Sequence, residues 1–447
     1  MELNLKRKKE LDMENVIPEW FKRAAVYQIN LRTFSEEGTI KSATRELDNI
    51  ASLGFKIMYL CPIFKADVSD DKKYWSKRQL ASNTDNPKNP YRISDYFEID
   101  EEYGTMDDLR EFVRVSHELG MRVMLDLVYF HIGPNAPVLK SHPEFAIRDE
   151  SGNIVYGEWN FPVLNYDCEG LREYLYANMA YYVGEVGVDG FRCDVGDRVP
   201  LDFWREAKRR IRAITPDAVL LNEGYDPEYS DVFDANYGYP WHDTWRCYVY
   251  DMLNKSMTAK DTVRICREYK DDGLILFYMD SHDTVTDWPY RIEKHFGHDA
   301  MDMILTMNYT IAGVPMVYSG NELADTARLS MFANRFHRGA YETTDRRAQG
   351  DAVEKRKSLI KKLNALKYEK TVMQGGKTEW LDIEPDYVLA FRRVLGDKSL
   401  LFVGNFSTEA TEVSIETNGD VLLFNGADVS DGKVNLSKYG YAVLEEQ

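Results

Sequence analysis

The chain has 447 residues, 44% of them hydrophobic, which suffices for a large core and, at about 150 residues per domain, for two or three domains or one barrel with appendages. Its 74 acidic and 56 basic side chains give a net charge of −18, which repels nucleic-acid phosphates and anionic membrane surfaces. No stretch offers about 18 uninterrupted apolar residues, and the basic N-terminal segment lacks the apolar run of a signal peptide. We therefore expect a cytoplasmic protein with no nucleic-acid or membrane partner, and the sequence indicates no oligomeric state.

Short β-branched runs alternate with longer amphipathic stretches, which is the pattern of βα units around a parallel sheet. The predicted strands are 25–29, 56–60, 122–128, 188–194, 218–223, 231–235, 274–280 and 314–318. Eight strands close a barrel, so we predict an α/β fold with a (β/α)8 TIM barrel. Apolar residues recurring at three and four predict helices over 40–53, 106–119, 171–183, 201–214, 299–311 and 352–368.

Two connections, 61–96 and 131–166, are longer than βα loops usually are, and we expect both to wall the functional site. After Gly375 the sequence changes into short alternating runs, which predict a C-terminal antiparallel β-sandwich domain. The predicted domains are the barrel over 20–130 and 166–369, a short domain inserted after strand 3 over 131–165, and the β domain over 370–447.

Acids and histidines cluster at the predicted strand ends, where the reacting groups of such barrels lie. Strand three ends in DLVYFH, strand four in GFRCD, strand five in LLNE and strand seven in YMDSHD. These motifs supply Asp126, His131, Arg192, Asp194, Glu223, His282 and Asp283. A single buried acid can be a structural anchor, but several like charges on one rim are destabilising unless a reaction or an ion uses them.

Two chemistries use such a cluster. A divalent metal requires several carboxylates and histidines within about 2.6 Å of one point, whereas glycoside hydrolysis requires two carboxyl groups, one ionised and one protonated. Arg192 lies two residues before Asp194 on the same strand, so it points to the same side and can hold that carboxylate ionised. This favours Asp194 as a nucleophile and Glu223 as an acid/base whose pKa burial raises.

In order and spacing these motifs resemble those of the α-amylase family of retaining glycoside hydrolases, glycoside hydrolase family 13. DLVYFH is similar to the family's first strand-end motif, GFRCD to the second, NE to the third and DSHD to the fourth. Three further stretches resemble family segments in the same order, namely YRISDYFEIDEEYGTMDDL, FPVLN and GVPMVYSGNE. The resemblance runs from about Tyr27 to Glu322 and implies retaining cleavage or transfer of α-glucosyl units.

The resemblance implies three catalytic residues. Asp194 matches the nucleophile, Glu223 the acid/base, and Asp283 the third carboxylate, which grips the ring hydroxyls as the sugar distorts.

Five further positions match the family's sugar-binding and supporting residues. His131 and His282 resemble the histidines that bond the same sugar, and Tyr91 resembles the tyrosine that stacks beneath it. Arg192, counted with the substrate-binding residues, and Asp126 match the residues that support the nucleophile. A structural alternative stays open at two positions: Asp126 only organises strand ends, or Tyr91 only packs in the core.

The chain departs from the family pattern at two places. Phe130 stands where the first motif most often has Asn, which binds the structural calcium in the amylases proper; phenylalanine offers no metal ligand, so we expect no metal and no cofactor. After the matched nucleophile comes Val195-Gly196-Asp197, without the Lys-His pair that amylases acting on long starch chains commonly place near the leaving group. We therefore expect a different acceptor side.

The resulting hypothesis is a glycoside hydrolase of amylase or α-glucosidase type that hydrolyses malto- or isomalto-oligosaccharides, with a small oligosaccharide as its partner. Transfer remains open, because a sugar hydroxyl or a phosphate can intercept the glycosyl enzyme in a transglycosylase, isomerase or phosphorylase of the same fold. Two less favoured alternatives are a non-catalytic carbohydrate-binding module and a metal-dependent hydrolase that uses Asp126, His131, Asp194 and His282. The sequence leaves linkage, chain length, and exo or endo action undecided.

Overall fold

The computed structural model describes residues 16–82, 84–238, 247–268, 273–287, 291–327, 329–333, 350–430 and 432–446. The basic N-terminal segment, on which the expectation about export rests, lies largely outside these residues. Among the described helices, none is both long and apolar enough to cross a membrane. All five cysteines are free thiols.

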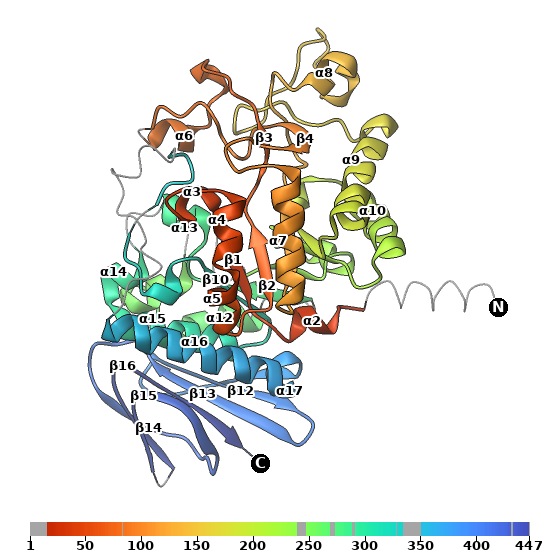
Figure 1. The fold of residues 1–447 in the computed structure, drawn as a ribbon. Helices are drawn as coiled ribbons and strands as arrows, with labels where there is room; N and C mark the ends of the chain where they lie inside the picture. The colour runs from red at the N-terminus through yellow and green to blue at the C-terminus, as the bar shows by residue number, and fades with distance from the viewer. Residues whose placement is uncertain are drawn as a thin grey trace, which may run out of the picture.

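Eight parallel strands form a closed barrel in the order β1-β10-β9-β8-β7-β6-β5-β2, which confirms the predicted (β/α)8 architecture (Figure 1). The strands are β1 Val26–Ile29, β2 Ile57–Leu60, β5 Arg122–Leu127, β6 Gly190–Cys193, β7 Val219–Asn222, β8 Ala235–Tyr237, β9 Leu274–Phe277 and β10 Val314–Tyr318.

The sixth strand lies further along the chain than the predicted 231–235. Asp226 accepts a hydrogen bond from the Glu228 main chain and caps a 3-10 turn, η5 Pro227–Asp231, which ends on the first residue of the predicted strand. The apolar residues that suggested a strand pack sideways instead, with the Phe233 ring 5.4 Å from that of Trp204. The strand begins only at Ala235.

The barrel helices agree closely with the apolar periodicity, except that the predicted helix 40–53 is broken at Glu46. The helices that cover the barrel are α4 Ile40–Arg45, α5 Leu47–Ser52, α7 Met106–Glu118, α9 Glu169–Tyr181 with a π-helical extension η3 Tyr182–Val186, α10 Leu201–Ile214, α12 Ala259–Glu268, α15 His298–Thr310 and α16 Asp351–Glu369. Shorter helices are α2 Glu19–Lys22, α3 Leu31–Phe34, α11 Tyr248–Leu253, α13 His282–Asp287, α14 Ile292–Phe296, η4 Gly196–Arg198 and η6 Asn321–Leu323.

The alternating direction of the side chains along the strands determines which residues fill the barrel. Side chains at every second position point inward, and the lower layers are apolar, with Val26, Ile57 and Met124 buried together. One pleat further on, towards the carboxyl ends of the strands, the inward positions become polar: Gln28, Tyr59, Asp126 and Arg192. The same periodicity that builds the core therefore delivers a polar layer to the barrel mouth.

The two long connections pack against each other. The first contains β3 Phe64–Ala66, η1 Lys72–Tyr74, α6 Lys77–Ala81 and β4 Ile93–Ile99, and the second contains α8 Pro137–Ser141 and η2 Pro143–Phe145. The Tyr74 and Tyr156 rings stack at 5.8 Å, and Asn160 donates to the Trp75 carbonyl at 2.9 Å. Asp67 accepts the Asn135 main-chain N–H at 2.7 Å.

The C-terminal part is an antiparallel sheet, as predicted, preceded by α17 Thr371–Gln374. Its strands are β11 Lys377–Leu381, β12 Val388–Leu395, β13 Lys398–Asn405, β14 Thr411–Ser414, β15 Asp420–Ser430 and β16 Lys433–Glu446. One face, with Phe391 and Phe402, shares the main core with α15 and α16, while the alternate residues Ala390 and Val403 belong to a separate core cluster. The sheet therefore packs beneath the barrel, away from the polar mouth (Figure 1).

Gly190, the first residue of β6, is required by the closeness of β7. A Cβ atom at this position would lie 2.5 Å from the Val219 carbonyl oxygen. We predict that Gly190→Ala lowers the free energy of unfolding by about 1–3 kcal/mol, because the strand backbone must shift. In urea denaturation, Gly184→Ala is the matched control, because its Cβ would meet only Ile214 at an ordinary 3.6 Å. Equal midpoints for the two variants would contradict this account.

Candidate active site

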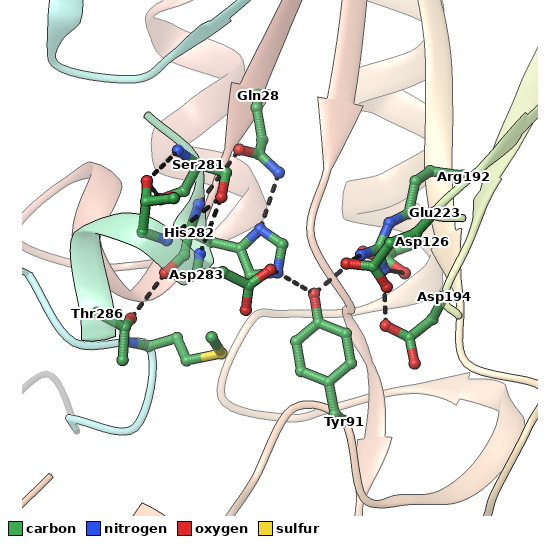
Figure 2. Close-up of polar contacts among 12 residues, drawn as sticks. Gln28, Tyr91, Asp126, Arg192, Asp194, Glu223, Ser281, His282, Asp283 and Thr286 are labelled. Atoms are coloured by element: carbon green, nitrogen blue, oxygen red, sulfur yellow. Dashed lines mark hydrogen bonds and ion pairs between the residues drawn. The ribbon is translucent and has the colours of Figure 1, made fainter. Parts of the chain in front are cut away.

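Arg192 is the centre of the polar layer at the barrel mouth. Its Nη1 lies 2.7 Å from Asp126 Oδ1 and 2.9 Å from Asp194 Oδ1, and its Nη2 lies 2.6 Å from Glu223 Oε1. Nε donates to the Tyr237 hydroxyl at 3.3 Å. One guanidinium from β6 therefore contacts carboxyl groups carried by β5, by the end of β6 and by the end of β7 (Figure 2).

A directed hydrogen-bond chain joins this cluster to the end of β9. Gln28 Oε1 accepts the His282 main-chain N–H, so Gln28 Nε2 donates to His282 Nδ1 at 2.9 Å. His282 therefore carries its proton on Nε2, which faces the Tyr91 hydroxyl. That hydroxyl donates to Asp126 Oδ2 at 3.2 Å, which also accepts from Tyr59 at 2.5 Å. Burial lowers the pKa of His282 to about 4, in keeping with a neutral ring.

Asp283 lies at the other end of this chain. Its Oδ2 is 3.2 Å from His282 Nε2, and its Oδ1 accepts from Arg78 Nη2 at 2.7 Å. Burial alone opposes ionisation of Asp283, but His282 and Arg78 hold the pKa of this carboxyl well below its usual range. Asp283 is therefore a carboxylate at neutral pH.

The carboxyl groups differ in their access to solvent. The side chains of Arg192 and Asp126 are fully buried, whereas those of Asp194, Glu223 and Asp283 are 8%, 17% and 30% exposed. Asp126 is thus a support held inside the barrel, and the other three carboxyl groups face the open mouth.

The pKa shifts differ from the sequence-based expectation for Asp194. Burial raises the pKa of Asp194 well above its usual range and also raises the pKa of Glu223, while Arg192 opposes both shifts. We expected Arg192 to keep Asp194 ionised, but Asp194 also faces the negative charges of Glu223, Asp126 and Asp283. Because one guanidinium serves three acids, it offsets only part of the cost of ionising them, and the pKa values of the cluster depend on one another.

A strained turn follows Asp194. Val195 has a left-handed backbone, with φ 38° and ψ 49°, a conformation that is costly for a β-branched residue. The turn directs the Val195 N–H at Glu223 Oε2, 2.9 Å away. Gly196 comes next because a Cβ there would lie 2.3 Å from Asn222 Oδ1. The backbone after Asp194 thereby fixes the second oxygen of Glu223.

His131 lies beside the cluster but contacts it only through the Tyr91 main chain. Its Nε2 lies 2.9 Å from the Tyr91 carbonyl oxygen, which can only accept, so Nε2 carries the proton and Nδ1 is an acceptor. The ring is buried against Trp159 and Phe161, and burial lowers its pKa to about 4. The buried Nδ1 has no hydrogen-bond partner among the described residues.

The centre of the Phe130 ring lies 6.0 Å from the ring centres of both His131 and Trp159. An apolar ring in this position supplies no oxygen or nitrogen ligand to a calcium ion. In the described part of the chain, no three His, Cys, Asp or Glu side chains are grouped as metal ligands.

Comparison with known proteins identifies the family. A family model described as the alpha amylase catalytic domain matches residues 15–150 and 154–389. The chain belongs to the α-amylase family. Asp194, Glu223 and Asp283, which the family resemblance singled out, are thus the three carboxyl groups that face the mouth of an α-amylase-family barrel.

Relatives within the family are distant. A cyclomaltodextrinase from a Bacillus species is 28% identical over 360 residues, which are 68% of this chain and 60% of that protein. An intracellular maltogenic amylase from Bacillus subtilis is 26% identical over 406 residues, which are 85% of this chain and 63% of that protein. The chain therefore spans about six tenths of the length of these two relatives. A crystal structure of an alpha-amylase from Lactobacillus plantarum has the same fold, with a TM-score of 0.79 and 23% identity over 96% of this chain and 100% of that chain.

The structure adds four residues to the site of this α-amylase-family protein. Gln28, Tyr59 and Tyr237 orient His282, Asp126 and Arg192, and Arg78 binds Asp283. Gln28 and Tyr59 occupy inward positions near the ends of predicted strands, so alternation alone was a usable signal for them. Tyr237 was not predicted because the expected sixth strand ended before it. Arg78 was not predicted because it lies in a long connection without a regular pattern.

We predict that Arg192→Met destabilises the protein by about 3–5 kcal/mol near pH 7, because three buried or partly buried carboxyl groups lose the cation that they share. A carboxyl group whose pKa is raised in the folded state binds more protons in the folded than in the unfolded protein. Such a group therefore lowers the free energy of unfolding further as pH rises. The deficit measured by urea denaturation should therefore shrink at about pH 5.

The matched control is Arg114→Met on α7, whose guanidinium is 53% exposed and pairs with Glu111 and Glu118. Its effect should stay within about 0.5 kcal/mol. A deficit for Arg192→Met as small as that of the control, or one that grows on acidification, would refute the shared-cation account.

Proposed function

We propose that this protein hydrolyses α-glucosidic bonds in small oligosaccharides with retention of the anomeric configuration. The observation that carries the proposal is the shared contact of Asp194 and Glu223 with Arg192, at 2.9 and 2.6 Å. It holds two solvent-accessible carboxyl groups on one side of the mouth, close enough together to flank a single glycosidic bond.

In the first half-reaction, Asp194 attacks the anomeric carbon while Glu223 donates its proton to the glycosidic oxygen. Arg192 engages Oδ1 of Asp194, which leaves Oδ2 for the attack. The carbon–oxygen bond breaks, a shorter sugar departs, and a β-linked glycosyl ester remains on Asp194.

In the second half-reaction, Glu223 takes a proton from water, and the water oxygen displaces Asp194 from the anomeric carbon. Both carboxyl groups return to their initial state, and the product keeps the α configuration. The Val195 N–H, bonded to Glu223 Oε2, keeps this carboxyl oriented through both steps.

The other residues of the site bind the glucosyl ring. The ionised Asp283 accepts hydrogen bonds from ring hydroxyls, and the unpaired Nδ1 of His131 accepts another. His282 orients the Tyr91 hydroxyl through Nε2, and the Tyr91 ring, stacked on His282 at 5.5 Å, offers an apolar face to the sugar.

The family relatives support the substrate class and the location. A cyclomaltodextrinase and an intracellular maltogenic amylase favour malto-oligosaccharides and a cytoplasmic enzyme. The absence of a Lys-His pair in Val195-Gly196-Asp197 supports an acceptor side unlike that of enzymes acting on long starch chains. We also propose that the enzyme works without calcium, since Phe130 replaces the family's ligand.

Azide distinguishes the roles of the two carboxyl groups. With an aryl α-glucoside as substrate, Glu223→Ala should lose about 10²–10⁴-fold in turnover, and azide should restore activity by attacking the glycosyl ester to give an α-glycosyl azide. In Asp194→Ala, azide should attack the substrate directly and give the β-glycosyl azide. Asp167→Ala, an exposed acid, is the control. If the two azide anomers are exchanged between the variants, the two roles must be exchanged.

A substrate panel tests the proposed specificity. Wild-type enzyme should consume maltotriose or isomaltose-type oligosaccharides faster than starch, with or without a chelator, and Glu223→Gln should consume none of maltose, maltotriose, isomaltose, panose, sucrose or trehalose. Equal rates on starch and maltotriose would overturn the oligosaccharide assignment. Lasting new oligosaccharides or sugar phosphates at high substrate concentration would establish transfer instead of hydrolysis.

A further inference from the structure

We propose that Arg78, on a connection outside the barrel strands, is a positioning residue that fixes Asp283 for sugar binding. This inference rests on the proposed function, in which Asp283 binds the glucosyl ring. It extends the site to a part of the chain that carries none of the strand-end motifs.

The contact is direct and directional. Arg78 Nη2 donates to Asp283 Oδ1 at 2.7 Å, while Oδ2 of the same carboxylate faces His282 Nε2 at 3.2 Å. Oδ1 of Asp283 is therefore held by a donor from α6, while Oδ2, beside the His282 ring, keeps its lone pairs for sugar hydroxyls. The Arg78 donor on one side and the His282 ring on the other restrict the orientation of the carboxylate before substrate arrives.

Arg78 itself is held by the anchoring of its short helix. Ser76 caps α6 by accepting the Gln79 main-chain N–H at 3.1 Å, and the buried Gln79 side chain donates to the Asn86 carbonyl at 3.0 Å. The Arg78 guanidinium also lies 5.8 Å from the centre of the Phe332 ring. These contacts restrict a long side chain that would otherwise sample many rotamers.

The segment that carries Phe332 is tied to the same neighbourhood. Thr84 donates to the Phe332 carbonyl at 3.0 Å, and Arg32 donates to the carbonyls of both Lys88 and Met331. The Met331 N–H donates to Thr286 Oγ1 on α13, the helix that carries Asp283. Arg78 and Asp283 are thus held in place relative to each other by contacts that join the first long connection, residues 331–332 and α13.

The electrostatic setting explains why a second cation is needed there. The charged or titratable groups that act on Asp283 or are acted on by it are Arg78, His282, Arg192, Asp194, Glu223, Tyr91 and Cys61. Arg192 is already shared by three acids, and His282 is neutral at neutral pH. Among the described residues, Arg78 is therefore the cation in direct contact with Asp283 when His282 is neutral.

The pair contributes little to stability, which makes it testable by substitution. The Arg78 and Asp283 side chains are 34% and 30% exposed, and ion pairs with such exposure typically add little to the free energy of unfolding. Arg78→Gln should therefore fold with an unchanged unfolding midpoint, so that any loss of activity reports on the site.

The experiment compares Arg78→Gln, Arg78→Lys, Asp283→Asn and the double variant Arg78→Gln/Asp283→Asn on the best substrate of the panel. Arg78→Gln should lower kcat/KM by about 10- to 100-fold, and Arg78→Lys should recover part of the loss. Lys77→Gln, an exposed neighbour on α6, is the control and should match wild type.

The double variant decides between positioning and an unrelated structural effect. It should be no worse than Asp283→Asn alone, because Arg78 acts through Asp283. Wild-type kcat/KM in Arg78→Gln, or multiplicative losses in the double variant, would overturn the inference. If Asp283→Asn is impaired while Arg78→Gln is not, only this inference fails; if Asp283→Asn is fully active, the proposed role of Asp283 fails.

Discussion

The site is organised by one buried guanidinium that serves three carboxyl groups. Arg192 has no exposure to solvent, and the barrel strand β6 places it directly beside Asp126, its register partner on β5. Isolated buried charges are costly, and a buried ion cluster is often no more stable than a well-packed apolar core. We interpret the presence of this costly ion cluster at the barrel mouth as a requirement of the proposed reaction. That reaction needs one carboxylate and one carboxylic acid side by side.

The two ends of the site are coupled by hydrogen bonds. Hydrogen bonds through Asp126, Tyr91 and His282 link the Arg192 cluster to the region of the Asp283 carboxylate. Gln28 fixes which nitrogen of His282 donates and which accepts. Tyr91 comes from the first long connection, so the docking of that connection onto the barrel completes the chain (Figure 2). The long connections supply side chains to the site as well as enclosing it. Variation in such loops is how one barrel scaffold supports different specificities.

Sequence patterns predicted the barrel and its helices because burial imposes a period of two on strands and 3.6 on helices. They failed at β8, where the apolar pair Val232-Phe233 packs against α10 from a loop, and at Glu46, where a helix breaks. The strand-end motifs predicted the carboxyl groups, since register places strand ends on one rim. Arg78 could not be predicted, because its contact with Asp283 spans 205 positions and depends on how a loop folds back.

The central claim is that Asp194 forms a covalent bond with the sugar, and trapping that bond tests it most directly. An activated fluorinated α-glucosyl fluoride, whose ester hydrolyses slowly, should inactivate the enzyme with one label per chain. Peptide mapping by mass spectrometry should place the label on Asp194. A label on Glu223 or Asp283, or turnover without any label together with a β-configured product, would contradict the retaining mechanism built on this cluster.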